Sequence, residues 1–191
     1  MKPLSRPAGR SRGLAPRSPA SLCAGPALGL ALLLAACAGQ EETSQYFCPE
    51  AVRVQDAAQL VRFSGSGRDL TDVLFEARLQ EVALACSYDD DENSIDGALR
   101  IALFAARGPA DSERQASFRY FVAIATESRR VIAREEFQVT IPFEGNRTQI
   151  NAVEELAPRI PLQPGESGGE YTLFVGLVLS TDELEYNRDN R

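Results

Sequence analysis

The fold is decided by the stretch Val73-Leu-Phe-Glu-Ala-Arg-Leu-Gln-Glu-Val-Ala-Leu-Ala-Cys-Ser-Tyr88. Its first half places an apolar residue at every second position, a period that is typical of a half-buried strand. These positions are Val73, Phe75, Ala77 and Leu79. The second half keeps the period but shifts by one residue, to Val82, Leu84, Cys86 and Tyr88. Because a one-residue shift would turn half of the strand inside out, we expect a β-bulge near Gln80 and Glu81.

The same period continues along the rest of the chain. Further strands are expected at 48–63, 99–105, 118–126, 131–143, 148–153 and 171–179. About seven antiparallel strands separated by turn signals predict an all-β, two-sheet sandwich of the immunoglobulin or fibronectin kind. A second bulge is expected near 134–136. The capping-box pattern Ser180-Thr-Asp-Glu183 predicts a short C-terminal helix over 181–188.

Residues 1–36 differ in composition from the remainder. They hold five of the 20 basic residues, none of the 27 acidic ones, and an apolar run over 26–36. A basic start followed by about 11 apolar residues is typical of a secretory signal peptide and is too short to span a bilayer. The sequence Leu34-Ala-Ala-Cys37 resembles the bacterial lipobox, whose cysteine receives a diacylglyceryl group. An unmodified Cys37 after an ordinary signal peptide is the alternative.

Processing before Cys37 would divide the chain into a signal peptide (1–36), a lipidated N-terminus with its tether (37–47) and a β-sandwich domain (48–191). Residues 37–191 keep 15 Arg against 27 acidic residues, a formal net charge of −12. Such a charge argues against nucleic acid and anionic lipid as partners of the protein surface. The expected membrane contact is the lipid on Cys37, in a periplasm-facing protein. Ala38, where Asp could stand, favours the outer membrane by resemblance to enterobacterial lipoproteins.

Two cysteines, Cys48 and Cys86, remain for the domain. In an oxidising compartment two thiols favour a disulfide. If 48–63 pairs antiparallel with 72–88, the numbers of two facing residues sum to about 134. The numbers of Cys48 and Cys86 have this sum, so the two cysteines would lie opposite each other. Two buried free thiols are the alternative.

The sequence contains no His. This excludes His-ligated metal sites, Ser-His-Asp and Cys-His catalysis, and a histidine pH switch. The acid pairs at 135–136 and 154–155 point to opposite faces of a strand and cannot flank one bond. We therefore expect no catalysis and no cofactor. Carboxylates brought together from distant strands are the remaining enzymatic alternative.

The acidic loop 89–97 is a candidate cation site. Asp89, Asp91 and Asn93 have the alternate spacing of the first calcium ligands of a calcium loop, and Asp96 adds a carboxylate. The EF-hand pattern fails further along the loop, at its glycine and at its final glutamate. A weak calcium site and a solvated acidic turn are both compatible with this pattern.

Apolar residues also occur where strands should face solvent, above all at Phe104, Phe121 and Phe174. Strands that are apolar on both faces must be covered. The cover is either internal, from the C-terminal helix or the Pro-rich segment 158–164, or it is a partner protein.

Several segments together resemble a group of proteobacterial lipoproteins of unknown function. They are the lipobox, Cys48, the Cys86-x-Tyr88 step and the segments 106–109, 120–123, 159–162 and 183–188. The resemblance covers most of the chain after Cys37 and implies a lipid anchor, but the shared segments bring no activity with them. We expect a lipid-anchored, non-catalytic interaction or assembly protein of the envelope. A cation- or ligand-binding lipoprotein that uses the loop 89–96 is the alternative.

Overall fold

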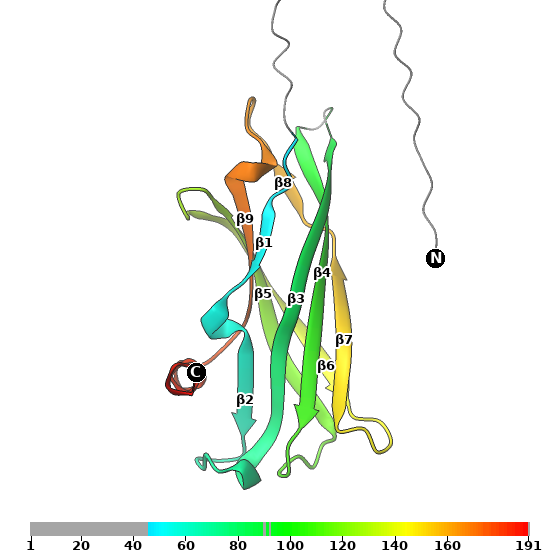
Figure 1. Ribbon diagram of the computed structural model, residues 1–191, viewed down its shortest axis with the longest axis vertical. Coiled ribbons are helices and arrows are strands. Elements are labelled where there is room, and N and C mark those ends of the chain that lie inside the picture. Colours follow the sequence, from blue (N-terminus) through cyan, green and yellow to red (C-terminus); the bar gives the residue numbers. More distant parts are fainter. Residues whose placement is uncertain (1–45, 90, 92, 191) are drawn as a thin grey trace, which may run out of the picture. The chain divides into compact units, whose positions relative to one another are not determined.

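The computed structural model describes residues 46–89, 91 and 93–190, which form two β-sheets packed face to face (Figure 1). One sheet has the strand order β1-β9-β5-β6, with β1 at Glu50–Arg53, β9 at Tyr171–Leu177, β5 at Gln115–Thr126 and β6 at Val131–Pro142. The other has the order β2-β3-β4-β7, with β8 beside β4; these are β2 (Gln59–Phe63), β3 (Val73–Asp89), β4 (Ser94–Arg107), β7 (Gln149–Leu156) and β8 (Arg159–Pro161). The 3₁₀ turns η1 (Gln55–Ala57), η2 (Leu70–Asp72) and η3 (Gly168–Glu170) and the helix α1 (Thr181–Asp189) complete these elements.

The predicted all-β, two-sheet sandwich with a C-terminal helix is therefore confirmed. Alternate side chains of both sheets meet in a single core, in which Leu103, Tyr120 and Leu173 are fully buried. The apolar alternation of the sequence thus corresponds to the inner faces of the sheets. The predicted signal peptide, Cys37 and the tether up to residue 45 lie outside the described residues.

The described chain has nine strands where about seven were expected. The segment 48–63 does not form one strand, because it turns at η1 and divides between the two sheets. Its first part, β1, pairs in parallel with β9, and the backbone N–H of Val54 donates to the carbonyl of Val175 (2.8 Å). Its second part, β2, pairs antiparallel with β3. The Pro-rich segment supplies β8, which pairs with the start of β4 at Ile95.

The expected bulge of β3 is confirmed, since the register with β4 shifts between Leu79 and Glu81. Arg53 of the other sheet stabilises it by donating one guanidinium nitrogen to the carbonyls of Leu79 (2.6 Å) and Gln80 (2.9 Å). The prediction of a bulge at 134–136 was wrong. Strands β5 and β6 stay in register from Ala133 to Pro142, and the shift falls at the turn-proximal end of β6, before Ala133.

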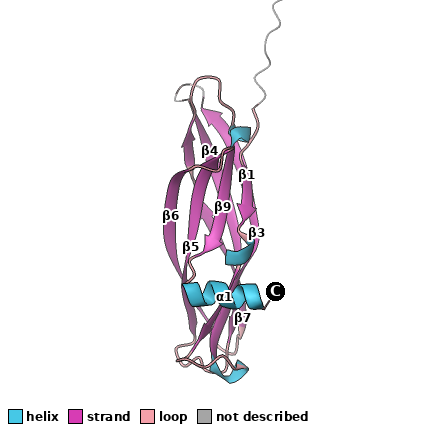
Figure 2. Cartoon of the chain, turned by 90° about the vertical axis from the view of Figure 1, so that its left-hand side faces the viewer, coloured by secondary structure: helices cyan, strands magenta, loops and turns pink. Residues whose placement is uncertain are grey.

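Helix α1 begins at the predicted cap, where the Ser180 hydroxyl accepts from the Glu183 N–H and the Glu183 carboxylate accepts from the Ser180 N–H. Figure 2 shows the helix running across the lower part of the sandwich. Its contacts are with β2 and η1. The fully buried Asn187 amide donates to the carbonyls of Asp56 (3.1 Å) and Gln59 (2.7 Å), which fixes the helix beside the edge of the five-stranded sheet.

Candidate interaction site

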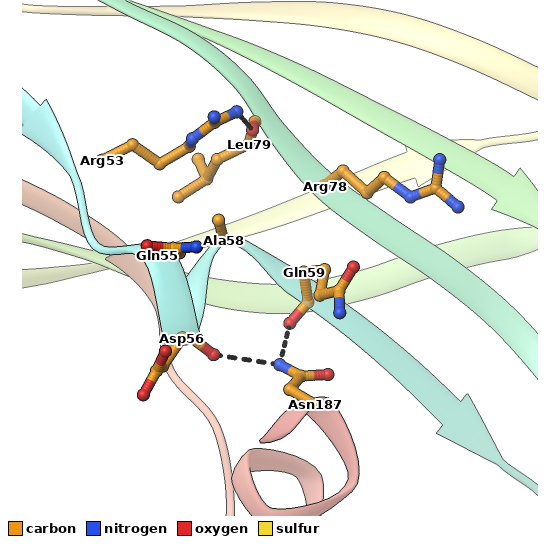
Figure 3. A pocket seen from close by; sticks show the side chains of 8 residues that line it. All are labelled: Arg53, Gln55, Asp56, Ala58, Gln59, Arg78, Leu79 and Asn187. Carbon is orange, nitrogen blue, oxygen red and sulfur yellow. Dashed lines mark hydrogen bonds between the residues drawn. The ribbon is translucent and has the colours of Figure 1, made fainter. Parts of the chain in front are cut away.

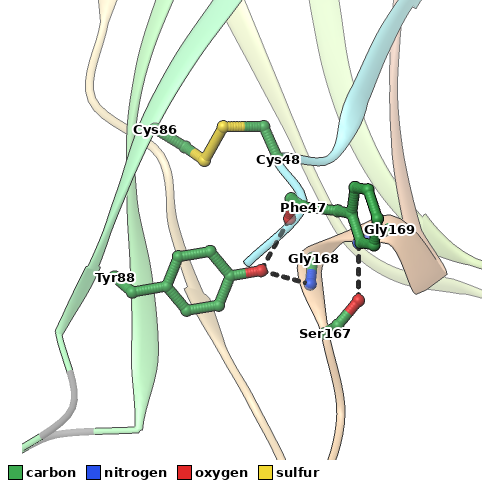
Figure 4. The surroundings of a disulfide bond; sticks show 7 residues. All are labelled: Phe47, Cys48, Cys86, Tyr88, Ser167, Gly168 and Gly169. Atoms are coloured by element: carbon green, nitrogen blue, oxygen red, sulfur yellow. Dashed lines mark hydrogen bonds between the residues drawn. A yellow bond between two sulfur atoms is a disulfide. The ribbon is translucent and has the colours of Figure 1, made fainter. Parts of the chain in front are cut away.

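The predicted disulfide between Cys48 and Cys86 is present, with 5.8 Å between the Cα atoms (Figure 4). The antiparallel pairing from which we expected it exists only for β2, in another register, and it does not extend to Cys48. In the register of β2 with β3, Leu60 faces Ala77. Cys48 is not part of this pairing, because it lies just before β1, and β1 and η1 separate it from β2 along the chain. The disulfide therefore joins the segment that leads into the four-stranded sheet to β3 of the five-stranded sheet. It is a link between the layers of the sandwich.

Tyr88 reinforces this link. Its hydroxyl donates to the carbonyl of Phe47 (2.6 Å) and accepts from the N–H of Gly168 (2.7 Å), as Figure 4 shows. Position 168 must be glycine, because a Cβ there would lie 2.3 Å from the Phe47 carbonyl oxygen. The chain that enters the domain at Tyr46 is thus held both by a covalent bond and by hydrogen bonds.

The acidic loop does not bring its predicted ligands together around a cation. The carboxylate of Asp96 accepts from the guanidinium of Arg159 at 2.8 and 3.3 Å, and the same guanidinium lies 3.8 Å from Asp89. Hydrogen bonding to Arg159 lowers the pKa of Asp96 below its ordinary value. Asp91 and Asn93 are exposed. Among the residues with described positions, no group of three or more His, Cys, Asp or Glu is arranged to hold a metal ion.

The Arg159 side chain thus supplies the positive charge beside Asp96, and its removal has a measurable result. We expect Arg159→Gln to raise the pKa of Asp96 toward its ordinary value. NMR titration of the Asp96 carboxyl carbon measures this pKa. Because the pKa is depressed in the folded state, the pair stabilises the fold above the ordinary pKa and loses this effect as the pH falls. Arg188→Gln, at a surface arginine paired with Asp56, is the control. An unchanged titration of Asp96 in Arg159→Gln would contradict the pairing.

The three aromatic residues predicted for a partner surface lie on two different faces. Phe121 of β5 and Phe174 of β9 point away from the core on the outer face of the four-stranded sheet, since Tyr120, Val122, Leu173 and Val175 point inward. Phe104 of β4 lies on the outer face of the other sheet, where the guanidinium of Arg78 is 5.7 Å from its ring. The structure brings Phe121 and Phe174 to one face and leaves Phe104 on the opposite one.

Phe121 and Phe174 belong to an apolar area that we call the outer-face patch, formed by Val52, Phe121, Ile132 and Phe174. Val52 pairs with Phe174, and Phe121 lies against Gly176, where a Cβ would be 2.7 Å from its ring. The Arg134 guanidinium covers the ring of Phe121 from outside at 4.5 Å. The helix α1 has its main contacts with β2 and η1.

A hollow of about 370 Å³ lies between η1, β3 and α1 (Figure 3). Most of the hydrogen-bonding groups that the structure shows there are engaged within the protein, but Oδ1 of the buried Asn187 has no hydrogen-bond partner. Arg53 donates to the bulge carbonyls, Asn187 donates to the carbonyls of Asp56 and Gln59, and Arg78 donates to Glu76 (2.8 Å).

The opposite side of the sandwich is open. There the last strands of the two sheets, β6 and β7, border two cavities of about 470 and 270 Å³, which we call the open-side groove. Apolar side chains such as Phe137 and Leu156 line it. Charged side chains of both signs line this side: Arg134, Glu135 and Arg159 at the larger cavity, and Glu144, Arg147 and Glu154 at the smaller one. The Glu154 carboxylate accepts from the hydroxyl of Tyr120 (3.4 Å). Burial, with the nearby carboxylate of Glu154, raises the pKa of Tyr120.

Sequence analysis missed this groove, although one signal for it was present. Glu154 occurs in the alternation of Ile150, Ala152 and Leu156, so it lies on the apolar face of its strand. An acid on an apolar face marks either an internal partner or an open side.

Comparisons with protein-family models, with curated proteins and with solved structures find no match to this chain.

None of the helices among the described residues has both the length and the apolar character needed to cross a membrane.

Proposed function

We propose that this protein is a lipid-anchored lipoprotein of the bacterial envelope, held in the membrane by an acylated Cys37. Its β-sandwich acts in the periplasm as a non-catalytic interaction module that binds another envelope protein. Two acyl chains on one cysteine meet the two-signal requirement for stable anchoring. The outer membrane is the favoured location, on the basis of Ala38.

The outer-face patch is the observation that carries the interaction role. Val52, Phe121 and Phe174 are half-buried, and Ile132 is 43% exposed, on the outer face of the four-stranded sheet. Apolar areas on an exposed sheet face mark contact sites, and aromatic residues are enriched in them. An envelope protein with a matching apolar surface is the partner that this chemistry fits.

The alternative of a cation-binding lipoprotein has no comparable support. Arg159 occupies the side of Asp89 and Asp96 where a cation would lie.

In-cell photo-crosslinking tests the interaction role. With p-benzoyl-phenylalanine at position 121 or 174, we expect a discrete crosslinked envelope protein in mass spectrometry. The matched control is the same probe at position 104, on the outer face of the other sheet, from which we expect no such product. Folded protein without a product from 121 and 174, or with the same product from all three positions, would contradict the patch as the contact site.

Cell fractionation tests the anchor. We expect Cys37→Ser to move the protein from the membrane fraction to the soluble periplasmic fraction, because the acyl chains supply the expected membrane contact. Cys23→Ser, inside the proposed signal peptide, is the control and should leave the protein in the membrane fraction. Membrane retention of Cys37→Ser would contradict a lipid anchor at this position.

A further inference from the structure

Two adjacent aromatic residues are exposed where the chain enters the sandwich. Tyr46 is 57% and Phe47 is 54% exposed, and every other aromatic residue that the structure describes is buried or half-buried. We call this pair the entry aromatics. Aromatic rings that gather at one place on a surface mark a contact with an apolar or interfacial partner.

The entry aromatics stand on a fixed platform. The Tyr46 ring lies edge-to-face against the Tyr88 ring, with 4.5 Å between the ring centroids. The carbonyl of Phe47 accepts from the Tyr88 hydroxyl (2.6 Å), and the disulfide holds the next residue, Cys48 (Figure 4). Because this backbone is already ordered, a surface that covers the rings gains their burial without the entropy cost of ordering the chain.

The length of chain before Tyr46 determines which surface lies within reach. Nine residues of chain lead from Cys37, the proposed site of acylation, to Tyr46, and at 3.3 to 3.6 Å each they span at most about 32 Å. The other end of the sandwich is much farther from Cys37. Val73 and Tyr88 lie near the two ends of β3, about 50 Å apart at about 3.3 Å per residue. An acylated Cys37 would therefore keep the end with the entry aromatics near the bilayer.

The bilayer interface also fits these rings chemically. Tyr combines an apolar ring with a hydroxyl and is enriched at headgroup level, and an apolar ring such as that of Phe gains by reaching the acyl boundary. A weak affinity is sufficient, because a short tether gives an effective concentration on the order of millimolar.

Charge restricts the kind of lipid. The described charged side chains around the entry are Asp89, Asp91 and Asp96 with Arg159, and Glu166 and Glu170 with Arg130. Acidic groups outnumber basic ones here, as they do in residues 37–191 as a whole. Anionic headgroups within a Debye length would be repelled. Zwitterionic headgroups have no net charge and offer a cationic group to these carboxylates.

We propose that Tyr46 and Phe47 insert into the membrane interface among zwitterionic headgroups, as a second membrane contact beside the acyl chains of Cys37. This inference rests on the proposed function and adds a membrane contact made by the protein itself. It also defines which end of the sandwich faces the bilayer.

Tryptophan fluorescence tests the inference, because the chain has no Trp of its own. Phe47→Trp places one reporter in the acylated protein, isolated from membranes and reconstituted in vesicles of phosphatidylcholine and phosphatidylethanolamine. We expect its emission to shift to shorter wavelength and to lose intensity with lipids brominated near the headgroup. Lipids brominated near the chain ends should quench it less. Tyr46→Trp gives a second reporter, and circular dichroism verifies that each variant is folded.

Leu70→Trp is the matched control. Leu70 is 82% exposed and belongs to η2, directly before β3, at the lower end of the sandwich in Figure 1. Its emission should not respond to brominated lipid, because this end lies away from the bilayer.

The headgroup assignment has its own measurement. Replacing part of the zwitterionic lipid with phosphatidylglycerol should weaken the quenching of Phe47→Trp. A salt concentration of about 1 M should remove this difference, since the Debye length then falls to about 3 Å. Stronger quenching in vesicles with phosphatidylglycerol would overturn the assignment to zwitterionic headgroups.

The failures of the two proposals are distinguishable. If mass spectrometry shows the acyl chains but neither reporter is quenched, or Leu70→Trp is quenched equally, this inference is overturned and the anchor stands. A discrete protein crosslinked in cells from p-benzoyl-phenylalanine at position 47, in place of lipid, would also overturn it and assign the rings to a protein partner. Protein isolated without acyl chains would overturn the proposed anchor, and this inference with it.

Discussion

Replacing Cys48 and Cys86 together with Ser is expected to lower the free energy of unfolding by about 3 to 4 kcal/mol, the largest effect that we predict for the domain. The two cysteines are 38 residues apart in the sequence, and the open chain gains the entropy of that loop when the crosslink is lost. For a domain of this size, the melting temperature followed by circular dichroism should fall by about 8 to 14 °C.

Reductant provides the control for this result. Dithiothreitol should lower the melting temperature of the wild-type protein by a similar amount and leave the double variant unchanged. A wild-type melting temperature that does not respond to complete reduction, verified by thiol titration, would contradict the stabilising role of the disulfide.

Asp111→Ala is expected to lower the free energy of unfolding by about 2 to 4 kcal/mol. Asp111 is buried in the turn between β4 and β5, where one carboxylate oxygen accepts from the N–H groups of Glu113 and Arg114 (2.9 Å each). The other accepts from Nε of Arg107 (2.8 Å). Truncation leaves two N–H groups and a guanidinium without this acceptor, while Arg107, which is 26% exposed, recovers part of its hydration.

Urea unfolding measures this effect, and the same turn offers a matched control. Ser112 is exposed, so Ser112→Ala should change the free energy of unfolding by no more than about 0.5 kcal/mol. Equal stabilities of Asp111→Ala and Ser112→Ala would show that the carboxylate does not hold the turn.

Local patterns predicted the elements of this fold well. The phase change between Leu79 and Val82 located a real bulge, because side-chain direction follows from position along a strand. The cap at Ser180 located α1, because capping depends on residues only three apart. The erroneous bulge near 134–136 has a local reason too, since the alternating apolar positions Val131, Ala133, Phe137, Val139 and Ile141 are all odd-numbered and require no phase change.

Long-range pairing could not be predicted in the same way. Nothing near Val52 indicates that β1 leaves its neighbour β2 and joins β9 in parallel, more than a hundred residues later. Arg159 reaches Asp96 across 63 positions, so the ion pair between them could not be predicted from the acidic loop alone. Strand order likewise decides which edges stay free, so the open side between β6 and β7 is a property of the assembled sheets.

The link at Cys48 also determines how the domain carries mechanical load. Tension on the chain before Tyr46 reaches the disulfide before it reaches β1, and it passes through Cys86 into β3. That strand has 17 residues and is paired with β4 over most of its length, so force is spread over the longest pairing among the described strands. Without the disulfide, the same tension would act on the four paired residues of β1. The crosslink therefore transfers tension on the chain before Tyr46 to β3 as well as to β1.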